Sequence, residues 1–187
     1  MNLNIEAEKQ NTYDAIVVGT GISGGWAAKE LTEKGLKTLV LERGRDVRHV
    51  LDYPTMTKEP WELPHADRLP AEEMKFYPVQ SRTNWVTQAN KHWWVKDNEN
   101  PYTEVKPFDW IRGYHAGGRS ITWGRQTYRL SDLDFEANLK DGVGVDWPIR
   151  YKDMSPWYDY VETFAGISGS HEGLPQLPDG RFLPPMQ

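Results

Sequence analysis

Three glycines and one carboxylate form the arrangement in this sequence that is best suited to binding a nucleotide. Gly19, Gly21 and Gly24 follow the spacing G-x-G-x-x-G directly after an apolar run. The first glycine permits a tight turn, the second lets a pyrophosphate approach the backbone, and the third lets a helix pack closely on a strand. Glu42 ends the next apolar run, where a carboxylate can accept hydrogen bonds from a ribose diol. The spacing therefore predicts a dinucleotide site.

A dinucleotide site of this kind requires a strand before the glycine motif, a helix after it and a second strand beyond the helix. Residues Ala15–Val18 are apolar and rich in β-branched side chains, which predicts a buried strand. Helical spacing follows over 22–34 and stops at Gly35, and a second apolar run over 37–42 predicts another strand. A crossover of this kind favours a parallel pair. The alternative, a tight turn beside an unrelated surface acid, does not explain this context.

The charge of Glu42 narrows the choice of nucleotide. A carboxylate at the end of the second strand repels a 2′-phosphate, so NADP is disfavoured. NAD and the ADP half of FAD both remain compatible with this first unit. The choice between them depends on the rest of the chain.

Composition excludes several other classes of function. The 187 residues carry a net charge of −5 without any basic run, so we expect no nucleic-acid partner. The chain has no cysteine, which excludes disulfides and thiolate metal sites. No apolar run approaches the roughly 20 residues that a transmembrane helix needs. Residues 1–12 form a polar tail without the pattern of a signal peptide, so the expected location is cytoplasmic.

The middle of the chain, over 45–111, is expected to be a loop-rich insertion in one domain over 13–187. Prolines and polar residues are frequent in it, which favours long loops with short strands or hairpins. If the run around Trp93 and Trp94 is a strand, the two indoles face opposite sides. Such rings could stack on a sugar, but packing against another part of a larger protein is the preferred interpretation.

Two helices are predicted in the last third of the chain. Ser131 is suited to cap a short one. A longer amphipathic helix is predicted from Pro156, with Ser155 as its cap and Gly166 at its end. The Pro- and Gly-rich residues 173–187 have no apolar period, which favours a linker.

A second glycine pair could form another part of a binding site. Gly117 and Gly118 suit a turn whose backbone N–H groups approach an anion or a flat ring, and Trp123 adds an aromatic surface nearby. A loop that feeds a core strand, with Trp123 buried, explains the same residues equally well. This run alone does not decide between the two interpretations.

Taken in order, these segments resemble the N-terminal portion of the glucose-methanol-choline (GMC) oxidoreductases, in particular their bacterial sugar dehydrogenase and pyranose oxidase branch. The matching runs are DAIVVGTGISGGWAAKEL, TLVLERG, GGRSITWG, DWPIRYKDMSPWYDYVE and LPPM. The resemblance implies an α/β fold with a Rossmann-like FAD-binding βαβ unit, an incomplete parallel sheet, a loop-rich insertion and a C-terminal helix. The implied chemistry is oxidation of a CH–OH group of a sugar or other alcohol by hydride transfer to FAD.

The resemblance also assigns cofactor-binding residues. The ADP part would lie against Gly19, Gly21, Ile22, Ser23, Gly24, Glu42 and Arg43, and the flavin end against Gly117, Gly118, Ser120, Thr122 and Trp123. Covalently flavinylated pyranose oxidases carry a histidine immediately before the tryptophan of this segment, where the present chain has Thr122. A hydroxyl is poorly suited to that linkage, so we expect dissociable FAD.

No catalytic residue is predicted within the chain. In the family the base is a histidine of the C-terminal half, and the histidines here lack a matching context: His49, His65, His92, His115 and His171. Only His115 is expected to approach the cofactor, although a loop histidine that supports the backbone or faces solvent is the simpler interpretation. We therefore expect a part of a larger enzyme whose substrate-binding and catalytic C-terminal domain is absent.

Two other hypotheses remain open. An NAD-dependent dehydrogenase domain would explain the first glycine motif but has no need of the second glycine segment. A non-catalytic nucleotide-binding subunit would act only with a partner chain. The resemblance identifies neither the substrate nor the electron acceptor. It is compatible with a small partner subunit, including a signal-bearing one that leads to the periplasm.

Overall fold

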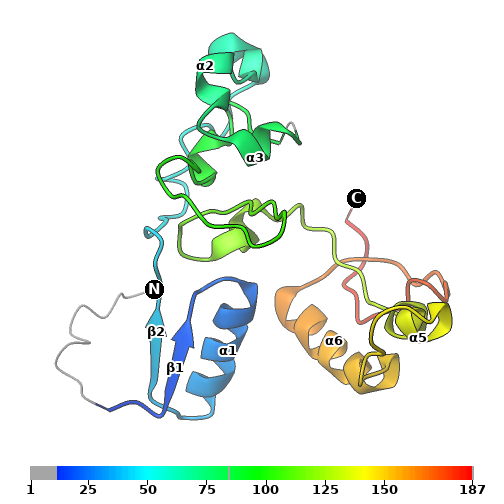
Figure 1. The fold of residues 1–187 in the computed structure, drawn as a ribbon. Helices are drawn as coiled ribbons and strands as arrows, with labels where there is room; N and C mark the ends of the chain where they lie inside the picture. The colour runs from blue at the N-terminus through cyan, green and yellow to red at the C-terminus, as the bar shows by residue number, and fades with distance from the viewer. Residues whose placement is uncertain (1–11, 84, 187) are drawn as a thin grey trace. The chain divides into compact units, whose positions relative to one another are not determined.

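The computed structural model describes residues 12–83 and 85–186. These residues form two units, and the boundary between them lies after Trp123. Each unit has internal contacts of its own, and Figure 1 shows the course of the chain through them. None of the helices in the described part of the chain is both long enough and apolar enough to cross a membrane.

The first unit opens with the β-α-β arrangement that the glycine spacing predicts (Figure 1). β1 (Ala15–Val18) and β2 (Thr38–Leu41) form a two-stranded parallel sheet, in register from Ala15 opposite Thr38. α1 (Ile22–Glu33) connects the strands and packs against both of them. The predicted Rossmann-like α/β fold and its parallel pair are confirmed.

The C-terminal end of α1 follows the glycine signal. Gly35 adopts φ +83°. Its N–H donates to the carbonyl of Thr32 at 3.0 Å, and the N–H of Leu36 donates to the carbonyl of Leu31 at 3.1 Å. This is the Schellman motif, for which glycine is favoured because the left-handed backbone brings it no steric cost.

The sheet leaves apolar side chains uncovered. Ile16 and Val18 lie on the same face of β1 and are 62% and 81% exposed, and Leu41 of β2 is 48% exposed. Two strands alone bury too little apolar surface for independent stability. Within the described residues the sheet is therefore incomplete, as the resemblance implies.

Over its described residues, 45–83 and 85–111, the insertion contains short helices instead of the expected strands or hairpins. They are η2 (Pro60–Glu62), η3 (Pro64–Asp67), α2 (Ala71–Met74), α3 (Pro78–Ser81) and η4 (Lys91–Trp93). Three of them, η2, η3 and α3, carry proline in the first turn, where the N–H that proline lacks has no helical partner. Three of the prolines that suggested irregular loops, Pro60, Pro64 and Pro78, thus begin single turns of helix.

The insertion has a small hydrophobic cluster. Leu69, Tyr77, Val86 and Trp94 are buried and pack together. Trp93 ends η4, so the two neighbouring tryptophans do not lie on opposite faces of a strand. The expectation of a strand is wrong here, and Trp94 is covered by its own insertion.

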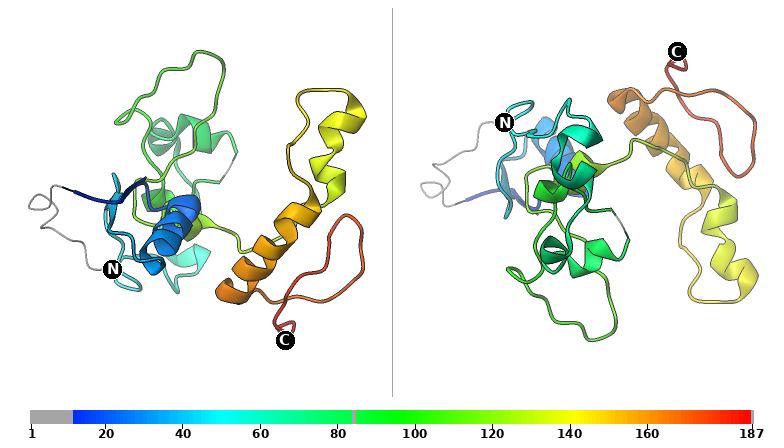
Figure 2. Two further views of the ribbon diagram at one scale, coloured as in Figure 1. Left: turned by 90° about the horizontal axis from the view of Figure 1, so that it is seen from below. Right: turned by 90° about the horizontal axis from the view of Figure 1, so that it is seen from above.

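The described residues of the second unit, 124–186, form three helices. Figure 2 shows these helices in yellow and orange. α4 (Asp132–Phe135) and α5 (Ala137–Asp141) are short, and α6 (Tyr151–Ala165) is the longest helix in the described chain. Ser131 caps α4 as predicted, since its hydroxyl oxygen accepts the N–H of Leu133 at 3.2 Å.

α6 begins five residues earlier than predicted. Arg150 is its N-cap, and the Asp153 carboxylate accepts the N–H of Arg150 at 2.8 Å, which closes the first turn. Ser155 and Pro156 therefore lie inside the helix, because this earlier cap outweighs the local Ser-Pro signal. Gly166, with φ +69°, ends the helix as predicted.

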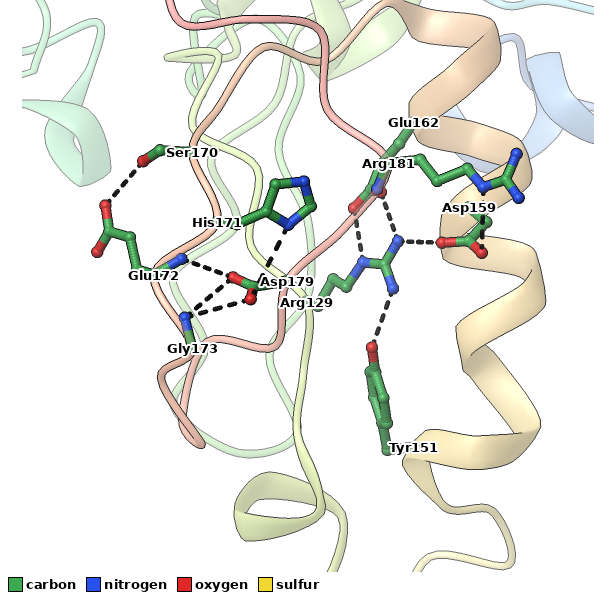
Figure 3. A network of polar contacts seen from close by, with 10 residues as sticks. All are labelled: Arg129, Tyr151, Asp159, Glu162, Ser170, His171, Glu172, Gly173, Asp179 and Arg181. Carbon is green, nitrogen blue, oxygen red and sulfur yellow. Dashed lines mark hydrogen bonds and ion pairs between the residues drawn. The ribbon is translucent and has the colours of Figure 1, made fainter.

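A buried ion-pair network connects α6 with the segments that precede and follow it (Figure 3). The Arg129 guanidinium donates to the two oxygens of Glu162 at 2.8 and 2.5 Å, to Asp159 at 2.5 Å and to the Tyr151 hydroxyl at 2.9 Å. The N–H of Arg181 also donates to Glu162, at 2.8 Å. Hydrogen bonding to Glu162 is the largest cause that raises the pKa of Arg129. This network fixes the second unit around one buried charge pair.

The residues after α6 fold back onto it, contrary to the expected linker. The N–H of Leu183 donates to the carbonyl of Ile167 at 2.8 Å, and the N–H of Gly169 donates to the carbonyl of Leu183 at 3.0 Å. This segment therefore forms backbone hydrogen bonds with the residues that follow α6, although its sequence has no apolar period.

Candidate functional site

The first glycine loop lies between β1 and α1 and requires glycine at two of its positions. Gly19 adopts φ +89°, in the region that favours glycine. A Cβ built on Gly24 would lie 2.0 Å from the carbonyl oxygen of Gly19, a separation that no side chain can adopt. The third glycine thus lets α1 start directly against the strand, as the spacing predicts.

The N-terminus of α1 is open toward an anion. Gly21 is its N-cap, and in the described part of the chain no side chain caps the helix. Apart from the backbone of Gly21 itself and of its neighbours in the chain, no heavy atom of the described residues lies within 4 Å of a Cβ built on Gly21. Ile22 and Ser23, the next two residues, are exposed. The first N–H groups and the positive end of the helix dipole can therefore meet a phosphate here.

Glu42 lies one residue beyond β2 with its carboxylate turned onto the glycine loop. Its Oε2 accepts the N–H and the hydroxyl of Thr20 at 2.8 and 2.5 Å, and its Oε1 accepts the N–H of Gly44 at 2.7 Å. Burial acts to raise the pKa of Glu42, but hydrogen bonds from Thr20, Gly44 and Arg43 outweigh it and hold the pKa below its ordinary value. Glu42 is thus a fixed anionic acceptor at neutral pH, and its Oε1, which accepts the Gly44 N–H, has a second lone pair that can accept a further hydroxyl.

The chain beyond Glu42 pairs with the approach to the second glycine segment. The N–H of Arg45 donates to the carbonyl of Tyr114 at 3.1 Å, and the carbonyl of Arg45 accepts the N–H of Ala116 at 2.8 Å. Gly44 permits this pairing, because a Cβ there would lie 2.1 Å from the backbone nitrogen of His115. This backbone pairing places the second glycine segment next to the first glycine loop.

The two glycine segments meet at this point. The N–H of Gly117 donates to the Thr20 hydroxyl at 2.9 Å. Gly118 adopts φ +52°, and a Cβ on it would lie 3.1 Å from the Cα of Gly21. η5 (Gly118–Thr122) follows and contacts α1 (Figure 1). Residues that are far apart in the sequence therefore form one continuous backbone surface.

Hydroxyl groups hold the turn of this second segment. Ser120 donates to the carbonyl of Gly117, and Thr122 donates to the carbonyl of Arg119 at 3.2 Å. Trp123 directly follows the turn and is 41% exposed. The segment is a helical turn with an accessible indole, unlike a loop that buries Trp123 before a core strand.

Aromatic side chains surround the pairing. The Arg43 guanidinium lies 4.0 Å from the centre of the Tyr114 ring, a cation–π contact. His115 is 3% exposed, and its ring meets the edge of Trp93 with 5.4 Å between the ring centres. Burial is the main cause that lowers the pKa of His115, so this imidazole is neutral at pH 7. His115 packs in the interior of the first unit and does not face solvent.

Thr20 and Gly44 are the residues at this site that sequence reasoning missed. The glycine motif specifies no residue type at Thr20, yet this side chain contacts both Glu42 and Gly117. Thr20 and Gly117 are 97 positions apart in the sequence. No local pattern could have indicated that they touch.

Comparisons with known proteins agree with this geometry. The family described as NAD(P)-binding Rossmann-like domain matches residues 17–54. The chain is 26% identical to 2-methyl-1,2-propanediol dehydrogenase of Mycolicibacterium austroafricanum, over 89% of this chain and 26% of that protein. It is 28% identical to the gluconate 2-dehydrogenase flavoprotein of Pantoea cypripedii, over 88% and 27% of the two chains. It is 27% identical to the fructose dehydrogenase large subunit of Gluconobacter japonicus, over 83% and 27%.

These similarities confirm the resemblance to the GMC oxidoreductases along most of the chain. The chain spans about a quarter of the length of the curated relatives it matches. The matched family and the β-α-β geometry both belong to a nucleotide-binding fold.

Proposed function

We propose that this chain is the FAD-binding part of an oxidoreductase that oxidises a CH–OH group of a sugar or other alcohol. The observation that carries the proposal is the meeting of the two glycine segments, joined by the hydrogen bond of 2.9 Å between the Gly117 amide and the Thr20 hydroxyl. An ADP-sized ligand needs only the first segment, whereas a longer dinucleotide can extend over both. The similarity to a protein named as a flavoprotein supports flavin as the second half of that ligand.

Each end of the site has its own part in this proposal. The pyrophosphate would lie at the N-terminus of α1, where Gly21 leaves the backbone accessible. Glu42 would accept a ribose hydroxyl, and the turn around Gly117 and Gly118 would approach the flavin. When bound, FAD would supply the acceptor for the hydride. The residues of this chain would bind the cofactor and orient it.

We further propose that the FAD is dissociable. Thr122 stands where covalently flavinylated relatives carry histidine, and its hydroxyl donates to the carbonyl of Arg119 at 3.2 Å. An alcohol oxygen held in this way is a weak nucleophile compared with an imidazole nitrogen. Denaturation should therefore release all of the flavin.

The remaining partners belong to the same proposal. The substrate would be a sugar or other alcohol, in line with the names of the similar dehydrogenases. A partner subunit is supported by the similarity to a protein named as a large subunit. NAD in place of FAD is the second candidate, because the matched family is described as NAD(P)-binding and a carboxylate at Glu42 suits NAD equally well.

A methyl group at Gly21 tests the proposal without disturbing the fold. Beyond its own neighbours in the chain, no described atom lies within 4 Å of a Cβ there, so Gly21→Ala should change the free energy of unfolding by less than about 1 kcal/mol. The methyl would occupy the space through which the pyrophosphate approaches the backbone, so the affinity for FAD should fall at least about tenfold.

Titrations of the cofactor-free chain with FAD, FMN and NAD provide the measurement. Gly25→Ala is the matched control, because Gly25 lies within α1 and a Cβ there would lie 3.8 Å from the carbonyl oxygen of Thr20, an ordinary van der Waals contact. We expect binding of FAD and not of FMN, since FMN lacks the ADP half. Tight binding of NAD with none of FAD would refute the proposal in favour of the second candidate.

A further inference from the structure

Thr20 is hydrogen-bonded on both sides of its hydroxyl group. Its Oγ1 donates to Glu42 Oε2 at 2.5 Å and accepts the N–H of Gly117 at 2.9 Å. Its own N–H donates to the same Oε2 at 2.8 Å. All three residues are half-buried, so water competes only partly for these bonds. One threonine thus joins the acidic end of β2 to the second glycine segment.

The chemistry of this junction requires a hydroxyl. A hydroxyl can donate one hydrogen bond and accept others at the same oxygen, which no apolar side chain can do. The bond to an ionised carboxylate is of the stronger, charge-assisted kind. Valine has the shape of threonine but would leave the Gly117 amide without its partner and deprive Glu42 of one donor. The substitution would therefore remove a hydrogen bond at Glu42 and another at Gly117.

The second glycine segment is attached to the first loop at two places. On one side its backbone pairs with Arg45, through Tyr114 and Ala116. On the other side the Thr20 hydroxyl holds Gly117. The first attachment fixes the distance of the segment from the end of β2, and the second fixes its position over the glycine loop.

We propose that Thr20 is a positioning residue that aligns the ADP end and the flavin end of the cofactor site. It holds Oε2 of Glu42 against the loop, so that Oε1, which accepts one N–H from Gly44, is the oxygen left to accept a ribose hydroxyl as well. It also sets the Gly117 turn relative to the N-terminus of α1. This inference rests on the proposed function, because it assigns Thr20 a part in binding the same cofactor.

The alignment predicts a selective loss of affinity. ADP contacts only the first end of the site, so Thr20→Val should weaken ADP binding at most about threefold. FAD would depend on both ends, so its affinity should fall about tenfold or more, the equivalent of one or two hydrogen bonds. Thr20→Ser keeps the hydroxyl and should restore both affinities to within about twofold of the wild type.

Two measurements on the full chain test this. Titration with FAD and with ADP gives the ratio of the two affinities, and amide hydrogen exchange without any ligand reports on the Gly117 N–H. We expect faster exchange at Gly117 in Thr20→Val and wild-type exchange in Thr20→Ser. Thr20→Ala, which removes the hydroxyl without adding a second branched methyl, replaces the valine variant if that variant does not fold.

The outcomes separate this inference from the proposed function. If the wild-type chain binds FAD, two results would overturn the role of Thr20 alone: equal losses of FAD and ADP affinity in Thr20→Val, or Gly117 exchange in that variant at the wild-type rate. If the wild-type chain binds no FAD, the proposed function is wrong, and the positioning role of Thr20 in cofactor binding is wrong as well. The exchange result then still shows whether the threonine joins the two segments.

Discussion

Replacing Gly24 by alanine should destabilise the chain, whereas the same change at the next residue should not. A Cβ at Gly24 would lie 2.0 Å from the carbonyl oxygen of Gly19 and 3.5 Å from Cγ1 of Val17. At Gly25 the corresponding neighbour is the carbonyl oxygen of Thr20, at 3.8 Å. Because the obstacle at Gly24 is backbone, no change of rotamer relieves it. α1 must instead move away from β1.

The loss of stability in Gly24→Ala can be estimated by comparison with Gly25→Ala. Alanine is favoured over glycine within a helix by about 0.5–1 kcal/mol, so Gly25→Ala should be neutral or slightly stabilising. Both variants share that gain, and their difference isolates the steric cost, for which overpacked sites give about 1–3 kcal/mol. Urea unfolding followed by circular dichroism measures it. Equal stability of the two variants would refute the close approach of α1 to β1.

Three further predictions concern other contacts. Gly44→Ala should accelerate hydrogen exchange at the amides next to His115, because its Cβ would lie 2.1 Å from the His115 nitrogen; unchanged exchange would contradict the pairing. Glu162→Ala should lower the free energy of unfolding by about 3–5 kcal/mol, since Arg129 stays buried without its main partner, and a loss under about 1 kcal/mol in denaturant titrations would disprove this. The stability that ionised Glu42 provides is present above its ordinary pKa of 4.5 and is lost as the pH falls through the lower pKa of the folded state. The difference in unfolding free energy between the wild type and Glu42→Gln should therefore shrink from pH 7 to pH 3. A difference that stays constant over this range would show that ionised Glu42 does not stabilise the fold.

The parts of the fold that could be predicted depend on signals within a few residues. The β-α-β unit is visible in the change from apolar runs to helical spacing, and Gly35 and Gly166 mark helix ends through a conformation that glycine adopts without cost. Ser131 is recognisable because a cap acts on the turn that follows it. In each case the cause and its effect lie within about one turn of helix.

The failures have a common physical cause as well. Three prolines of the insertion, Pro60, Pro64 and Pro78, begin helical turns, and Trp94 is buried by residues that no local pattern brings together. α6 starts at Tyr151 because Arg150 and Asp153 cap it earlier than Ser155 could. At the site itself, the glycines could be predicted one by one. Their meeting depends on contacts between distant segments, which the sequence does not display.

The most direct test of the central proposal is to identify the cofactor that the purified chain carries. The visible absorption spectrum is recorded first, and the ligand is then released by acid and identified by mass spectrometry. We predict a flavin spectrum, near-stoichiometric unmodified FAD in the supernatant, and no flavin mass left on the chain. A folded, colourless chain that binds NAD and not FAD would contradict it.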